Sequence, residues 1–131
     1  EGFKRALLGA KVVAVPQSTS GIYLLKEVFP KLGLADRINV KVAERGSQSA
    51  GMVASGEADI AVQPISELMH VQGIDYVGRL ADELQLIQVF SAAIVQGSKQ
   101  TDAAKRLIQF LASGRAARVI EKNGMEPIRR P

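Results

Sequence analysis

Three short apolar runs each give way to small residues that carry a hydroxyl or an amide, and a helix-like pattern follows each of them. The runs and their continuations are KVVAV into PQSTSG at residues 11–21, VKVAE into RGSQSAG at residues 40–51, and ADIAV into QPISE at residues 58–67. We name the three polar continuations the first, second and third elbow. A strand that leads into a helix start presents free amide groups at the positive end of that helix. The chemistry this pattern suits is the binding of an anion, which requires no catalytic group.

The first elbow is the strongest candidate site. Ser18, Thr19 and Ser20 supply three hydroxyls beside the amides of a helix start, and Gly21 would let a ligand approach the backbone. The alternative is ordinary helix capping, in which one hydroxyl accepts a hydrogen bond from a helix amide and the others are solvated.

The second and third elbows add fewer groups. Arg45 is a cation that can pair with a carboxylate or phosphate through two hydrogen bonds, and Gly46 and Ser47 follow it. An ordinary surface arginine is the alternative. Gln63 in the third elbow can donate its amide to an anion or bond the edge of a strand, and the sequence does not choose between the two.

Acid–base groups are sparse in this sequence. His70 is the only histidine, which removes most acid–base dyads and nearly all histidine metal sites. Glu44 is a further carboxylate, while Glu57 and Asp59 flank the entry to a strand, where solvated side chains are the simpler interpretation. The chain has neither cysteine nor a glycine-rich nucleotide motif. We therefore predict a binding module, not an enzyme, with no cofactor and no metal.

Composition narrows the class of partner. The chain has 131 residues, 47% of them hydrophobic, which is enough for one compact core or for one lobe and part of another. The net charge is +4, but the basic residues are scattered and aromatic residues make up only 5%, so we do not expect nucleic acid as a partner. No apolar run approaches the roughly 20 residues of a membrane-spanning helix. The first residues read as a helix entered midway, so we expect a truncated or processed product.

The elbows need a scaffold that brings them together. Apolar spacing and punctuation by Gly and Pro predict strands at 11–15, 40–43 and 59–62, an edge strand at 74–77 and a long extended run at 84–95. The same signals predict helices at 2–9, 20–31, 47–55, 101–112 and 115–123, and a short helix after Pro64. This alternation is typical of an α/β fold, with a mostly parallel sheet flanked by helices. In such sheets the ligand crevice lies beyond the carboxyl ends of the strands, where all three elbows fall.

Several strings, in this order, resemble the carboxyl-terminal part of periplasmic solute-binding proteins of the molybdate-binding-like group, the receptors of ABC transporters. The strings are SGIY at 20–23, GEADIAV at 56–62, the run from Phe90 to Gly97, and the helical stretch from Ala103 to Gly124. The resemblance covers residues 11–127 and implies a type II periplasmic-binding-protein lobe with part of the second lobe. Residues 1–84 would be the second, ligand-binding lobe, and residues 85–131 a crossover strand and terminal helices that rejoin the missing first lobe.

The resemblance also implies partners. The ligand would be a small anion, delivered to an inner-membrane ABC transporter permease from the periplasm. Apolar surface on the returning segment indicates a homodimer or a segment-exchanged dimer of this chain as a further expectation. Receptors of this group carry a tyrosine after the third strand, where this chain has Gln63 and Pro64. That departure disfavours a metal oxyanion and makes an organic carboxylate or a phosphorylated acid at least as good a ligand.

Two other function classes stay open. An isomerase of small carboxylic acids on the same scaffold would use Glu44, Glu57 or His70 as its base. A ligand-sensing domain of a regulator would need a DNA-binding segment upstream.

Overall fold

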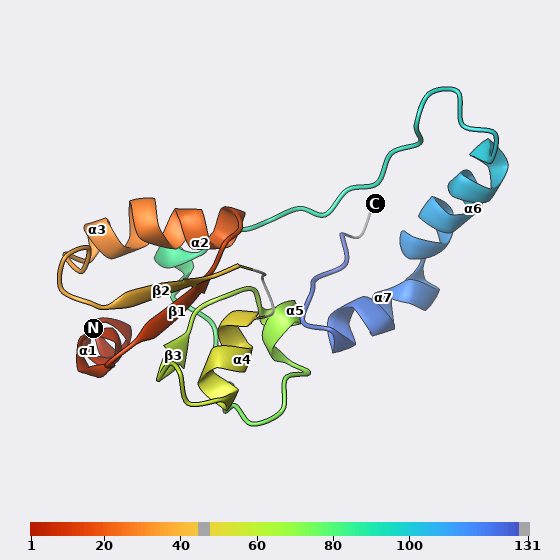
Figure 1. Cartoon of the computed structure of the whole chain (residues 1–131). Coiled ribbons are helices and arrows are strands. Elements are labelled where there is room, and N and C mark those ends of the chain that lie inside the picture. The colour runs from red at the N-terminus through yellow and green to blue at the C-terminus, as the bar shows by residue number, and fades with distance from the viewer. Residues whose placement is uncertain (45–47, 129–131) are drawn as a thin grey trace. The chain divides into compact units, whose positions relative to one another are not determined.

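The strand β1, Val13–Pro16, is the centre of the fold, and all four of its residues are buried in the computed structural model of the protein. The structure describes residues 1–44 and 48–128. It divides into two units, Glu1–Leu86 and Ile87–Pro131. The first unit holds the sheet, and the second is helical (Figure 1).

Two strands pair with β1, both in parallel. The sheet order is β2-β1-β3, with β2 at Val40–Ala43 and β3 at Ile60–Ala61. Val13 of β1 is in register with Val40 on one side and with Ile60 on the other. Because all pairs are parallel, the carboxyl ends of the three strands meet at one edge of the sheet. The predicted α/β class with a parallel sheet flanked by helices is confirmed.

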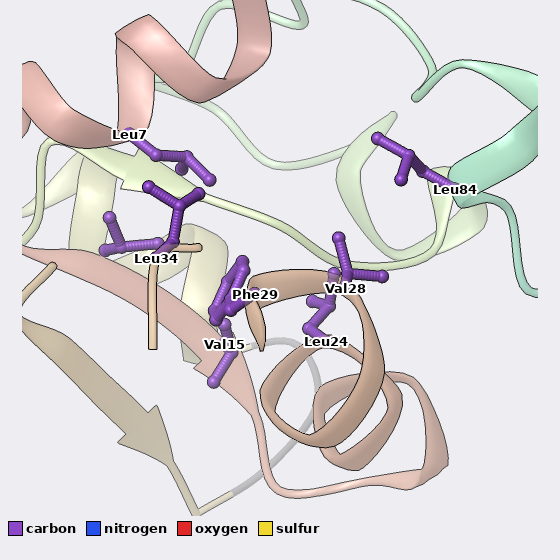
Figure 2. Close-up of a cluster of buried hydrophobic side chains, with 8 residues drawn as sticks. Leu7, Val15, Leu24, Val28, Phe29, Leu34 and Leu84 are labelled. Atoms are coloured by element: carbon purple, nitrogen blue, oxygen red, sulfur yellow. The ribbon is translucent and has the colours of Figure 1, made fainter. Parts of the chain in front are cut away.

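Alternate residues of β1 enter two separate cores, as the period of a strand requires. Val13 and Val15 belong to one apolar cluster, which Figure 2 shows around Phe29, while Ala14 belongs to a second cluster on the opposite face. The first cluster also contains Leu7, Leu24, Val28, Leu34 and Leu84, and the second contains Ala43, Met52 and Ala58. Helices therefore cover both faces of the sheet.

Each face has its own helices. The first cluster takes residues from α1 (Gly2–Gly9) and from a continuous helical segment made of α2 (Thr19–Tyr23), η1 (Leu24–Val28) and α3 (Phe29–Lys31). The second cluster takes Met52 from α4 (Gln48–Ala54). Short elements complete the unit, namely α5 (Ile65–Leu68) and the 3₁₀ turn η2 (Asp82–Leu84).

The predicted helix at 20–31 is confirmed, and Pro30 changes its geometry. The amide of Phe29 donates to the carbonyl of Leu24, five residues back, so the turn before the proline is wide. Proline crowds the carbonyl four residues before it, and a wide turn of this kind relieves such crowding.

Gly33 ends this helix, as predicted from the sequence. Its φ is +66°, and its amide donates to the carbonyl of Pro30 at 2.9 Å. The amide of Leu34 donates to the carbonyl of Phe29 at 2.7 Å, which completes a Schellman motif. Leu34 and Phe29 are both buried in the first cluster, so the turn that stops the helix also adds to the core.

The second unit contains two amphipathic helices, α6 (Thr101–Leu111) and α7 (Gly114–Lys122). The predictions at 101–112 and 115–123 are confirmed. Gly124 has a φ of +75° and ends α7 with the same motif that ends the helix at Gly33. The amide of Gly124 donates to the carbonyl of Glu121 at 3.0 Å, and the amide of Met125 donates to the carbonyl of Ile120 at 3.2 Å.

Two predicted extended segments are not strands. Residues 74–77 are irregular, and in the predicted run at 84–95 Leu84 ends the turn η2 and residues 85–95 are irregular. No described residue pairs with either segment in a sheet. A strand exists only where a neighbouring strand satisfies its backbone groups, and apolar composition cannot supply that neighbour. Several residues of the second segment are exposed, among them Ile87, Val89, Phe90 and Val95.

Candidate functional site

The first and third elbows lie at the same edge of the sheet. The amide of Gln17, just after β1, donates to Ala43 at the end of β2 at 2.9 Å. On the other side, the amide of Val62 donates to Ala14 of β1 at 3.1 Å, so Gln63 leaves the sheet beside the end of β1. The structure therefore brings these two elbows together. Arg45, Gly46 and Ser47 of the second elbow lie outside the described residues.

The hydroxyls of the first elbow are not used for capping. Ser18 is the residue before α2 and has an extended backbone, but its side chain makes no capping hydrogen bond. Instead the hydroxyls of Ser18 and Ser20 bond each other at 3.0 Å. Thr19 is exposed on the first turn of the helix. The elbow thus presents a paired set of hydroxyls at the edge of the sheet, and their role in ligand binding stays a prediction.

Gly21 has a structural role that the sequence did not reveal. It is buried, and a Cβ placed on it would lie 1.7 Å from the carbonyl oxygen of Pro16. The helix therefore rests directly on the backbone at the end of β1, and this close approach requires glycine. Packing accounts for Gly21 without any ligand.

Gln63 uses its amide nitrogen within the protein. Its Nε2 donates to the backbone carbonyl of Glu67 at 3.1 Å, so this bond joins the two ends of the third elbow across the single turn of α5. Its carbonyl oxygen Oε1 is buried and accepts no hydrogen bond from the described residues. The side chain therefore presents an acceptor to its surroundings, whereas the sequence analysis left open whether its amide donates to an anion or bonds the edge of a strand.

Glu67 is a polar residue of this edge that the sequence analysis missed. It is half-buried, and its Oε2 is covered yet accepts no hydrogen bond from the described part of the chain. A covered polar atom without a partner costs about 1–3 kcal/mol, so it is uncommon in a folded protein. The signal available in the sequence was its position at the end of the third elbow, four residues or about one helical turn after Gln63.

Glu57 and Asp59 lie at the opposite end of the sheet. Asp59 accepts a hydrogen bond from the amide of Val12 at 2.8 Å, beside the start of β1. Glu57 bonds the ammonium of Lys41 at 2.9 Å and the hydroxyl of Ser55 at 3.2 Å. The bond and charge of Lys41, with the Ser55 hydroxyl, lower the pKa of Glu57 below its usual value. Both carboxylates stabilise local structure, and Glu57 is a poor candidate for a base.

An open groove runs along the outer side of β2 and α4. Its lining residues are Lys41, Val42, Ala43, Glu44, Gln48, Gly51, Met52, Ser55 and Glu57. Glu44, a base candidate from the sequence, is exposed at one part of this groove. His70 is exposed shortly after α5.

Within residues 1–44 and 48–128, no three acidic or histidine side chains gather closely enough to hold a metal ion. None of the described helices has the length and apolarity that crossing a membrane requires.

The sequence as a whole matches a known family. Residues 3–126 match the family of bacterial extracellular solute-binding proteins, and because this match spans nearly the whole chain, the protein belongs to that family. The chain is also similar to an aconitate isomerase from a Pseudomonas species, with 39% identity over 129 residues. That alignment covers 98% of this chain and 49% of the relative, so the chain spans about half the length of the curated relative it matches. No solved structure matches the chain.

These findings confirm the predicted solute-binding family and correct one prediction. The sequence analysis predicted that the protein is not an enzyme, but the relative that aligns with almost the whole chain carries the name of an enzyme. The prediction was wrong because it required a paired acid and base to be visible in the sequence. One carboxylate placed by the fold is sufficient for a proton shift, and such a residue leaves no pattern of its own.

Proposed function

We propose that this chain is part of an extracellular isomerase of small unsaturated carboxylic acids, with aconitate as the substrate to test first. The observation that carries the proposal is the 39% identity to an aconitate isomerase along 98% of the chain. Membership of the solute-binding family supports the part of the proposal that requires the protein to hold a small solute.

The isomerisation requires only that one proton is removed from the substrate and that a proton is returned at another carbon. Aconitate carries a methylene group next to a carbon–carbon double bond and to a carboxylate, which makes the methylene hydrogens acidic. A base removes one of these protons, the double bond shifts along the three-carbon skeleton, and a proton returns at the far carbon. No atom is gained or lost, and the new double bond can adopt the other geometry. General acid–base catalysis of this kind contributes about 10²–10⁴-fold to a rate.

The binding part of the reaction requires groups that hold several carboxylates. In our proposal the hydroxyls of Ser18 and Ser20, which bond each other at 3.0 Å, turn toward a carboxylate when the substrate enters. Thr19 and the adjacent helix amides contribute further donors, and Arg45 and Ser47 of the second elbow contribute a cation and a hydroxyl. The net charge of +4 favours the approach of a polyanion.

The finer features of the family resemblance belong to the same proposal. The first unit would be one lobe of a type II binding-protein fold of the molybdate-binding-like group, working in the periplasm. Closure of two lobes around the substrate would exclude water during the proton shift. Family membership also favours a second role for the same site, namely capture of a small anion for uptake by an ABC transporter.

The direct test is to incubate the intact protein with cis-aconitate and to follow the vinyl proton signals by ¹H NMR. Appearance of trans-aconitate at a rate proportional to protein concentration supports the isomerase. Calorimetric binding of cis-aconitate without any turnover supports the receptor role and refutes the isomerase. If the protein neither binds nor converts aconitate, this substrate assignment is refuted.

A further inference from the structure

The edge of the sheet that carries the elbows contains a carboxylate whose covered oxygen has no described donor. We propose that Glu67 is the base that removes and returns the proton in the isomerase reaction, and that Gln63 positions it. This inference rests on the proposed function and assigns a role to Glu67, a residue of the third elbow that the sequence analysis did not select as a site residue.

The first argument is the unpaired oxygen of the carboxylate. Oε2 of Glu67 is covered and accepts no hydrogen bond within residues 1–44 and 48–128. A carboxylate oxygen that is hydrogen-bonded in the protein is stabilised as an anion and is a weaker base. An oxygen without a donor retains its lone pairs for a proton from the substrate. A covered polar atom without a partner is rare in a folded protein, and a catalytic role is one of the explanations for such an atom.

The second argument is position. Glu67 lies on the single turn of α5, which follows directly from the carboxyl end of β3 through Gln63 and Pro64. The first elbow leaves the neighbouring strand β1 at the same edge. A substrate held by the hydroxyls of Ser18 and Ser20 would therefore have Glu67 on the adjacent strand–helix connection.

The third argument is the bond that fixes the turn. The Nε2 of Gln63 donates to the carbonyl of Glu67 at 3.1 Å, so the side chain before the helix holds the backbone of the residue that bears the base. The unpaired Oε1 of Gln63 leaves a second acceptor at this place. Gln63 is thus a positioning residue in this proposal, and it contacts the reaction only through Glu67.

The other candidate carboxylates fit the role less well. Glu57 is held by Lys41 and Ser55 at the opposite end of the sheet. Glu44 is exposed beside the open groove along β2, so water would compete for its oxygens.

In the proposed step, the C–H bond of the substrate methylene breaks and its proton passes to Oε2 of Glu67. The electron pair of that bond forms the new double bond, while the pair of the old double bond takes up the proton from Glu67 at the far carbon. The carboxylate ends as it began, so the step needs no oxidant, reductant or cofactor.

The test compares the intact wild-type protein with Glu67→Gln, Glu67→Asp and Glu27→Gln, using cis-aconitate followed by ¹H NMR in H₂O and in D₂O. Glu67→Gln keeps the size of the side chain and removes its basicity, so kcat should fall about 10²–10⁴-fold while KM changes less than about threefold. Incorporation of deuterium from D₂O into aconitate should fall with kcat. Glu27→Gln changes an exposed glutamate in η1 and should leave kcat within twofold of wild type.

Each outcome separates this inference from the proposed function. If the wild type is active and the Glu67→Gln variant is equally active, the role of Glu67 is refuted, whereas the proposed isomerase function is retained. A variant that raises KM at unchanged kcat also overturns it, because the residue then only binds. An inactive wild type overturns the proposed function and this inference with it. If Glu67→Gln does not fold, Glu67→Asp decides, since moving the carboxylate back by one methylene should lower kcat at least tenfold, and an unchanged kcat overturns the proposal.

Discussion

Gly21 lies so close to Pro16 that a Cβ on the glycine would be 1.7 Å from the proline carbonyl oxygen. This contact joins the start of the longest helical segment to the end of the central strand. It fixes the direction in which the first elbow leaves the sheet, and so it decides where the hydroxyls of Ser18 and Ser20 lie.

Gly21→Ala should destabilise the protein strongly. The added methyl group meets backbone atoms, which cannot rotate away, so either the helix or the end of β1 must shift. Overpacking of this kind costs about 1–3 kcal/mol and occasionally more. Urea denaturation followed by circular dichroism measures the loss.

Gly51→Ala is the matched control for this substitution. Gly51 lies within α4 and is exposed, and a methyl group added to it would meet no atom within 4 Å. Because alanine is the better helix former, the variant should be about 0.5–1 kcal/mol more stable than wild type. Equal effects of the two substitutions would contradict the contact between Gly21 and Pro16.

Leu34→Ala should reveal that the residue after the helix-ending glycine belongs to the core. Leu34 is 0% exposed and joins the first cluster beside Phe29. Truncation of a leucine buried this completely costs about 2–5 kcal/mol, measured as the free energy of unfolding in urea. The control is Leu8→Ala in α1, where the side chain is 37% exposed and the loss should stay below about 2 kcal/mol. A loss for Leu34→Ala as small as that of the control would refute the role of this turn in the core.

Lys41→Met should raise the pKa of Glu57. The hydrogen bond and charge of Lys41 are the main causes that hold this pKa below its usual value of 4.5. Removing them leaves only the Ser55 hydroxyl, so the carboxyl signal of Glu57 should titrate at a higher pH in ¹³C NMR. Lys26→Met, which changes a lysine of η1, should leave the Glu57 titration unchanged.

The sign of the linked stability follows from the direction of that shift. A carboxyl whose pKa is lower in the folded state stabilises the fold above its unfolded pKa, and the contribution disappears as the pH falls through the folded value. The wild type should therefore lose this contribution only below about pH 4.5, and Lys41→Met should show a smaller loss in the same range. An identical Glu57 titration in the two proteins would show that the ion pair is not formed in solution.

Ser20→Asp should abolish binding of cis-aconitate by the intact protein. The new carboxylate would stand beside the hydroxyl of Ser18 in the first elbow, where it repels an anionic ligand. Ser20→Asn, of nearly equal size but uncharged, is the control and should weaken calorimetric binding by less than about tenfold. Unchanged affinity in Ser20→Asp would remove the first elbow from the binding site.

Much of the fold could be predicted because its signals are local. The helices at 2–9 and 101–112 follow from apolar spacing, and Gly33 and Gly124 end helices because each adopts a positive φ that other residues disfavour. The parallel arrangement follows from the alternation of strands and helices. The strands predicted at 74–77 and 84–95 are absent from the structure. A strand needs a partner strand, and its own sequence does not specify whether that partner is present.

The amino-acid sequence by itself determined the order of the helices and of the three strands that form the sheet, the end of the sheet at which the first and third elbows lie, and the solute-binding family. Only the tertiary structure decided what individual side chains do there: Gly21 packs on Pro16, the Gln63 amide turns to Glu67, and Glu57 pairs with Lys41 at the far end of the sheet. The physical reason is the distance along the chain over which each signal acts. Periodicity and turn residues act over a few positions of the chain, whereas the partner of a polar side chain depends on which strands lie side by side after folding.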